Sequence, residues 1–206
     1  MSLFNKPKKQ LCPELFTENE QFRQNVRLYI FDDINKILTP GIVVGIYILG
    51  SSVGRQYDED SDIDLNLILR KGLDRINYKE YVKKYNGRLL PGTNHIIKYH
   101  VQNNFEPNFA DSEYAIYDLV RDTWAIPPKK YEDILDPEQE FKKEIAYAKM
   151  YAKTISASDK VRIFDKLIND RKDIYRFGWG TPRELQQNIL YKFVEKAFKT
   201  RLEDLK

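Results

Sequence analysis

Two apolar runs in the first third of the chain have the spacing of β-strands. Residues 42–50, IVVGIYILG, are apolar at nearly every position and bounded by glycines, which is typical of a strand buried on both faces. Residues 62–69, DIDLNLIL, alternate instead, with Asp62, Asp64 and Asn66 on one face and apolar side chains on the other. The pattern predicts two neighbouring strands, the second of which has a polar face.

Helical spacing is found before these strands and again in the last third of the chain. Thr17 and Glu20 form a capping-box pattern, which predicts a helix from there to Pro40. Further elements expected after the two strands are a short helix at 78–87, a strand at 95–102 and a hairpin within 113–126. The helices predicted beyond them span 136–155, 158–177 and the residues after Thr181.

These elements divide the chain into two parts. Residues 14–130 are predicted to form a mixed α/β core, and residues 131–206 an all-helical part that packs on the core or on a partner. Residues 1–13 are polar, contain two prolines and are expected to form a loose arm. The predicted fold class is therefore α/β (α+β): a small mixed sheet flanked by helices, with a helical C-terminal extension.

The composition is that of a folded protein and excludes several classes of site. The chain has 206 residues, of which 42% are hydrophobic and 13% aromatic, and this argues against disorder. The formal net charge of +3 is only a weak indication of an anionic partner. Cys12 is the only cysteine, so we expect no disulfide and no cysteine zinc site. No apolar run is long enough for a membrane span, so we expect no membrane partner and a cytoplasmic location.

The loop that joins the two strands carries residues suited to phosphate and metal binding. Gly50 permits close backbone approach, and the Ser51 and Ser52 hydroxyls can donate hydrogen bonds to phosphate oxygens. Asp62 and Asp64 point the same way, so their repulsion requires a compensating cation, and hard carboxylate oxygens suit Mg²⁺. A phosphate cradle beside a divalent metal indicates phosphoryl or nucleotidyl transfer. The alternative is an ordinary Asp-rich turn at a strand edge.

The segment 47–69, YILGSSVGRQYDEDSDIDLNLIL, resembles the signature of the polymerase-β-like nucleotidyltransferase superfamily: Gly-Ser, a spacer, then Ser-Asp-x-Asp. The resemblance implies that Asp62 and Asp64 bind two Mg²⁺ ions, with Mn²⁺ as an alternative, while Gly50 and Ser51 hold a nucleoside triphosphate such as ATP. It also implies transfer of a nucleoside monophosphate to an acceptor hydroxyl, with release of pyrophosphate. The acceptor stays open between RNA, a protein and a small molecule. Arg55, in the same loop, is either a phosphate contact or a solvated side chain.

The chain departs from this family pattern at the third carboxylate. The family usually places it on the next core strand, but residues 95–102, HIIKYHVQ, contain no Asp or Glu. Asp118 is the favoured third ligand if its strand lies beside that of Asp62, and His100 is a second candidate, as base or ligand. The third explanation is a degenerate module, antitoxin-like, that binds nucleotide and metal without turnover.

Overall fold

The computed structural model describes residues 7–73, 75–101, 115–134 and 156–178, together with the single residues 142, 146 and 191. Contacts divide the chain into two units. The sheet unit comprises Pro7–Phe109 and Tyr114–Ile134, and the helical unit comprises Met1–Lys6, Ala110–Glu113 and Leu135–Lys206. The described residues contain a six-stranded mixed sheet and three α-helices, which confirms the predicted mixed α/β class.

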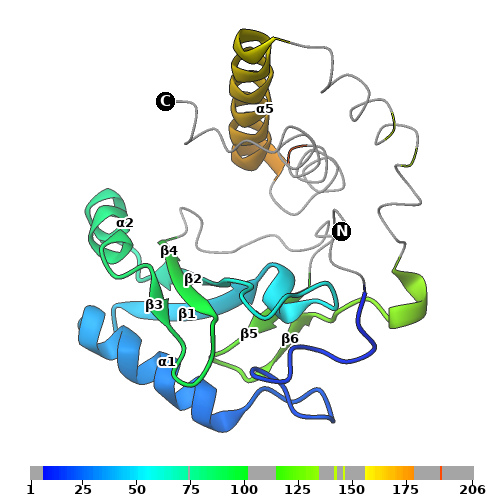
Figure 1. Cartoon of the computed structure of the whole chain (residues 1–206). Coiled ribbons are helices and arrows are strands. Elements are labelled where there is room, and N and C mark those ends of the chain that lie inside the picture. Colours follow the sequence, from blue (N-terminus) through cyan, green and yellow to red (C-terminus); the bar gives the residue numbers. More distant parts are fainter. Residues whose placement is uncertain are drawn as a thin grey trace. The chain divides into compact units, whose positions relative to one another are not determined.

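The sheet has the strand order β3-β4-β2-β1-β5-β6 (Figure 1). Its strands are β1 (Val43–Leu49), β2 (Ile63–Leu69), β3 (Arg88–Leu89), β4 (Ile96–Val101), β5 (Ile116–Asp118) and β6 (Thr123–Ile126). Only β2 and β4 pair in parallel among these strands, and helix α2 (Arg75–Lys83) lies in the connection between them, as a parallel crossover requires. The predicted strands and hairpin are confirmed, whereas α2 begins earlier than the expected residue 78.

Helix α1 (Gln24–Ile37) lies along one face of the sheet (Figure 1). Its apolar stripe is buried as its spacing predicted, and it joins the alternate apolar residues of β1, β2 and β4 in one core cluster. The helix residues in this cluster are Val26, Ile30, Ile34 and Ile37. Each buried aliphatic side chain stabilises the fold by about 1.5–3 kcal/mol, so this face anchors the sheet while the opposite face is left for polar side chains.

The capping-box prediction at Thr17 is wrong. Residues 17–21 form a tight turn instead, in which Thr17 N–H donates to the Gln21 carbonyl at 2.8 Å, and α1 begins only at Gln24. Phe16 and Phe22 flank the turn, pair as an isolated β-bridge and pack edge to face with ring centroids 5.2 Å apart. Burial of both rings therefore outweighs the local capping preference.

The expectation of a loose arm is wrong for residues 7–13. Leu11 and Cys12 are buried in the core cluster of the sheet unit. The segment is also held by hydrogen bonds, since the Tyr57 hydroxyl donates to the Leu11 carbonyl at 3.2 Å and Lys8 N–H donates to the Arg55 carbonyl at 2.7 Å. Two apolar side chains within a polar sequence are sufficient to anchor it.

The helical unit contains α5 (Ala157–Gly178), close to the predicted range 158–177. Ser156 caps this helix, because its hydroxyl accepts a hydrogen bond from Asp159 N–H at 3.2 Å. The other predicted helices, at 136–155 and after Thr181, lie outside the described residues except at positions 142, 146 and 191, which are helical. Among the described helices, none combines the length and apolar character that a membrane crossing would need.

Candidate functional site

One face of the sheet carries polar side chains on neighbouring strands. Residues paired across a sheet point to the same face, and the register pairs Asp64 with Lys98 and Asn66 with both His100 and Tyr47. Asp62 immediately precedes β2 and shares this face by alternation. The polar residues placed here by strand register are Tyr47, Asp64, Asn66, Lys98, His100 and Asp118.

Gly50 brings the backbone against the carboxylate of Asp64. It follows β1 with φ 92° and ψ −162°, a conformation open essentially to glycine alone. A Cβ atom at this position would lie 3.2 Å from Asp64 Oδ2. The glycine bend and the aspartate pair, predicted from sequence to lie close together, therefore meet at the same end of β1 and β2.

The bend continues into a short turn rather than an α-helix. The residues that follow Gly50 form only the 3-10 turn η1 (Ser51–Val53). Ser51 Oγ donates to Ser61 Oγ at 3.2 Å, and Ser61 Oγ in turn accepts from Asp58 N–H at 2.8 Å. The bend is thus joined to the residue that precedes Asp62.

Ser52 differs from Ser51 because its side chain points into the protein. The residue is fully buried, and its hydroxyl is the only buried side-chain polar atom without a hydrogen-bond partner among the residues that the structure describes. The predicted contact between the Ser52 hydroxyl and a phosphate is therefore corrected: a ligand on the surface does not reach it. Of the two predicted serine hydroxyls, only that of Ser51 is left for this role.

Both aspartates of the pair face a basic side chain from β4. Lys98 Nζ donates to Asp62 Oδ2, and His100 Nε2 lies 3.1 Å from Asp64 Oδ1. About one third of each carboxylate side chain is exposed, 33% for Asp62 and 37% for Asp64. Lys98 and His100 therefore compensate the repulsion between the two carboxylates. A metal ion that binds the aspartates would displace these two side chains.

Sequence reasoning missed this pairing, although a signal for it exists. Lys98 and His100 are two positions apart, as Asp62 and Asp64 are, so each pair has the spacing that puts both side chains on one face of a strand. The sequence alone did not show that β4 lies beside β2 in the register that brings the two sets together.

The proposal of Asp118 as third carboxylate is wrong because its condition is not met. Strand β5 pairs with β1 and not with β2, so Asp118 lies two strands away from β2, a sideways spacing of about 10 Å, and in register with Asn66 rather than with the aspartate pair. Its carboxylate is also engaged, accepting from Arg121 N–H at 2.9 Å and from the Arg121 guanidinium at 3.1 Å. Asp118 closes the β5–β6 turn instead.

Arg55 is also corrected from a phosphate contact to a structural residue. Its guanidinium pairs with Glu20 at 2.5 Å and donates to the carbonyls of Lys9 at 2.5 Å and Lys129 at 3.1 Å. The side chain is only 10% exposed. Because all three nitrogens are engaged, Arg55 joins the N-terminal segment to the end of the sheet unit.

No protein-family model, curated protein or solved structure matches the chain. The expected membership of the nucleotidyltransferase superfamily therefore stays a prediction from the sequence, and any functional assignment depends on the geometry at Gly50, Ser51, Asp62 and Asp64.

Proposed function

We propose that this chain is a metal-dependent nucleotidyltransferase, which moves a nucleoside monophosphate from a nucleoside triphosphate to an acceptor hydroxyl and releases pyrophosphate. The observation that carries the proposal is the approach of Gly50 to Asp64, with 3.2 Å between the site of a Cβ atom and Oδ2. A backbone that only glycine can form there leaves space for a phosphate beside a carboxylate. The acceptor is to be sought among RNA, protein and small molecules.

Asp62 and Asp64 are the residues that would hold Mg²⁺, or Mn²⁺ in its place. Both offer hard oxygen donors at a partly exposed edge, and Mg²⁺ characteristically combines one or two carboxylates with substrate phosphates. When bound, divalent ions supply charge neutralisation of the triphosphate and of the departing pyrophosphate. The absence of a carboxylate from β4, IIKYHV, means that triphosphate oxygens would have to complete the donor set.

The remaining residues of this face have roles that follow from their chemistry. The Ser51 hydroxyl donates to a phosphate oxygen at the bend. Lys98 pairs with Asp62 and would pair with a phosphate once it leaves that carboxylate. His100, 3.1 Å from Asp64, would accept the proton of the acceptor hydroxyl. Each role requires a contact that exists without substrate to break: the Ser51–Ser61 hydrogen bond, the Lys98–Asp62 pair or the His100–Asp64 pair.

A transfer assay tests this proposal. The protein is incubated with Mg²⁺, a host lysate and each nucleoside triphosphate labelled at the α-phosphate, and the labelled fraction identifies the acceptor class. A γ-labelled triphosphate should add no label beyond that which the lysate gives without the protein, because the γ-phosphate leaves in pyrophosphate. Asp62→Asn should abolish labelling with little effect on folding, since it removes a charge but little volume.

Asp60→Asn is the matched control for that variant. Asp60 is an exposed residue of the same loop, so its substitution makes the same change of charge two positions earlier and should leave labelling intact. Retention of activity in the Asp62→Asn protein would contradict the mechanism.

A second candidate is a module that binds nucleotide and metal without turnover. It is favoured by Lys98 and His100, which pair with the aspartates where the family usually has a third carboxylate. Calorimetry that detects nucleotide binding with Mg²⁺, together with no pyrophosphate release in the presence of any acceptor fraction, would select this function over transfer.

A further inference from the structure

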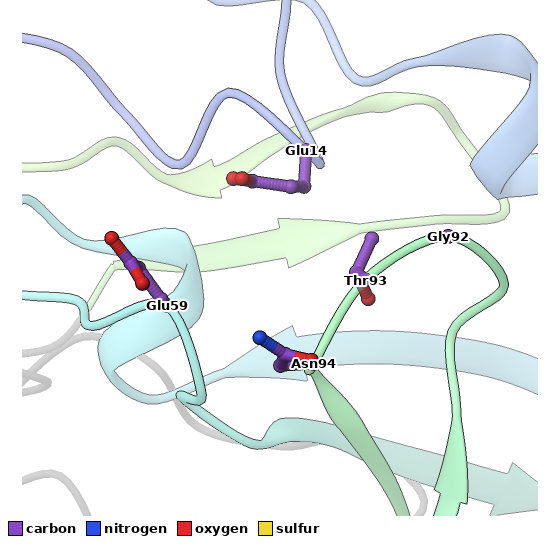
Figure 2. A pocket seen from close by; sticks show the side chains of 5 residues that line it. All are labelled: Glu14, Glu59, Gly92, Thr93 and Asn94. Atoms are coloured by element: carbon purple, nitrogen blue, oxygen red, sulfur yellow. The ribbon is translucent and has the colours of Figure 1, made fainter.

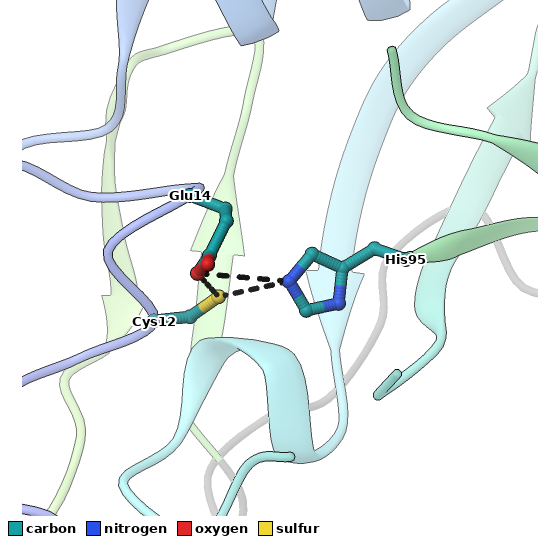
Figure 3. Close-up of side chains that lie close together, drawn as sticks. All are labelled: Cys12, Glu14 and His95. Atoms are coloured by element: carbon teal, nitrogen blue, oxygen red, sulfur yellow. Dashed lines mark hydrogen bonds and ion pairs between the residues drawn. The ribbon is translucent and has the colours of Figure 1, made fainter. Parts of the chain in front are cut away.

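A second cluster of metal-ligating side chains lies apart from the aspartate pair. Cys12 Sγ is 3.3 Å from Glu14 Oε2 and 3.3 Å from His95 Nε2, and the latter two atoms are 3.8 Å apart (Figure 3). All three residues belong to the sheet unit. The figure shows the thiol, carboxylate and imidazole pointing toward one another from the N-terminal segment and from the residue before β4.

The spacing of these three atoms fits a transition-metal ion. A point equidistant from them lies about 2.0 Å from each, and zinc is bound at about 2.3 Å by thiolate, 2.0–2.1 Å by imidazole and 2.0–2.2 Å by carboxylate. The donor types also favour zinc, because a soft thiolate and an imidazole do not suit Mg²⁺ or Ca²⁺. Only slight movement of the sulfur is needed.

The ring of His95 is held in the tautomer that a metal ligand requires. Its Nδ1 lies 2.8 Å from the carbonyl oxygen of Ser61, and a carbonyl can only accept a hydrogen bond. The proton is therefore on Nδ1, which leaves the lone pair of Nε2 directed toward Cys12 and Glu14. An outer hydrogen bond of this kind is the usual support of a metal-binding histidine.

The cluster is buried on one side and open on the other. Cys12 and His95 are fully buried, whereas the Glu14 side chain is 40% exposed. Glu14 also lines a polar pocket with Glu59, Gly92, Thr93 and Asn94 (Figure 2). A metal ion therefore has an entry route at Glu14, and a water molecule from the pocket can take the fourth position.

We propose that Cys12, Glu14 and His95 form a zinc site whose fourth coordination position faces this pocket. Thiolate and carboxylate charges together balance the two charges of Zn²⁺, so the bound site is neutral within its buried surroundings. Burial and the neighbouring Glu14 raise the pKa of the Cys12 thiol to about 12. Metal binding therefore breaks the S–H bond, forms a zinc–sulfur bond and releases the proton to solvent.

The site gives the single cysteine a partner that sequence reasoning did not consider. One cysteine led to the expectation of no cysteine zinc site, but His95 lies 83 positions away and only the fold brings it to Cys12. Its hydrogen bond to Ser61 also places the metal site directly behind the residue that precedes Asp62. Zinc would stabilise the N-terminal segment, the Ser61 loop and the start of β4 as one body.

Cobalt titration tests the proposal on the full chain. The reduced, chelator-treated protein is titrated with Co²⁺ in millimolar Mg²⁺, which occupies the hard carboxylate sites, and absorption is recorded in the near ultraviolet and visible. We expect a thiolate-to-cobalt charge-transfer band that saturates at one equivalent and disappears when Zn²⁺ is added. Zinc should also raise the thermal unfolding midpoint.

Two variants and two controls make the result decisive. Cys12→Ser should abolish the band. Glu14→Gln, at a partly exposed position, should retain the fold and weaken metal binding by at least the roughly 10- to 100-fold that loss of an outer-shell partner costs. Glu59→Gln, which changes another acid of the same pocket, and Asp62→Asn should bind cobalt as the unchanged protein does. The last comparison separates this site from the proposed transferase site.

Absence of the charge-transfer band at excess cobalt, or equal affinity in Glu14→Gln and Glu59→Gln, would overturn the proposal. The cluster would then be a set of hydrogen bonds within the core. The cobalt band is independent of the transfer assay, because it measures metal coordination and not activity.

Discussion

Gly50 is the residue on which the proposed chemistry depends most. Its backbone conformation is open essentially to glycine alone, and its missing side chain allows the backbone to lie close to Asp64 Oδ2. The sequence was sufficient to propose Gly50, Ser51, Asp62 and Asp64 as site residues, because all four belong to one short segment with a recognisable spacing. It misjudged residues whose role depends on distant partners, as with Arg55, which pairs with Glu20 across 35 positions.

We predict that Gly50→Ala lowers the free energy of unfolding by about 1–3 kcal/mol and also abolishes nucleotide binding. Gly72→Ala is the control, because Gly72 also has a positive φ, +86°, but nothing lies within 4 Å of an added Cβ atom. The Gly72→Ala protein should be less stable but should still bind nucleotide. Urea denaturation and calorimetry with Mg²⁺ and triphosphate measure both effects, and equal nucleotide binding by the two variants would contradict the role given to Gly50.

At the scale of elements, alternation and β-branched runs were sufficient to predict β1, β2, β4 and the β5–β6 hairpin. These signals are local and agree with the way the strands pack. The strand order was not predictable, because nothing local places β5 beside β1 instead of β2. The capping box failed for the same reason, since Phe16 and Phe22 are buried by tertiary packing.

A buried carboxylate joins α1 to the β3–β4 edge of the sheet. Asp33 on α1 accepts a hydrogen bond from the Tyr99 hydroxyl on β4, and it pairs with Arg88 on β3 at 2.5 Å. Only 6% of the Asp33 side chain is exposed. The contact therefore connects helix and sheet through a group that is costly to leave unsatisfied.

Asp33→Ala should lower the free energy of unfolding by about 1–3 kcal/mol, because it leaves the buried Tyr99 hydroxyl without its acceptor. The neighbouring Asp32 provides a control on the same helix. It pairs with Lys36 at 2.5 Å on the surface, where 61% of its side chain is exposed, so Asp32→Ala should cost less than about 1 kcal/mol. Equal losses in urea denaturation would show that Asp33 does not connect these elements.

At the scale of the whole molecule, buried tyrosines predict a loss of stability at alkaline pH. Burial, with a hydrogen bond to Asp33, raises the pKa of Tyr99, and burial with a hydrogen bond to Asp122 raises the pKa of Tyr117. The unfolded chain releases these protons near the ordinary tyrosine pKa of 10.0 while the folded chain keeps them. Stability is therefore fully present below pH 10 and falls as the pH rises above it.

Each such tyrosine should reduce the free energy of unfolding by about 1.4 kcal/mol per pH unit above its unfolded pKa. Urea denaturation between pH 8 and about 11.5 measures this slope. Tyr99→Phe should make the slope shallower, whereas Tyr81→Phe, at an exposed position, should change the slope less. A slope that Tyr99→Phe leaves unaltered would contradict the assignment of Tyr99 as a buried proton donor.

The central claim, that a triphosphate and its metal bind between the Gly50–Ser51 bend and the Asp62–Asp64 pair, is tested most directly by nuclear magnetic resonance. ¹⁵N-labelled protein is titrated with ATP in excess Mg²⁺, and the backbone amide signals are followed. We predict saturable shifts centred on Gly50, Ser51 and Asp64, absent from the Asp64→Asn protein. Unchanged signals at the bend, or identical shifts in the variant, would contradict the claim.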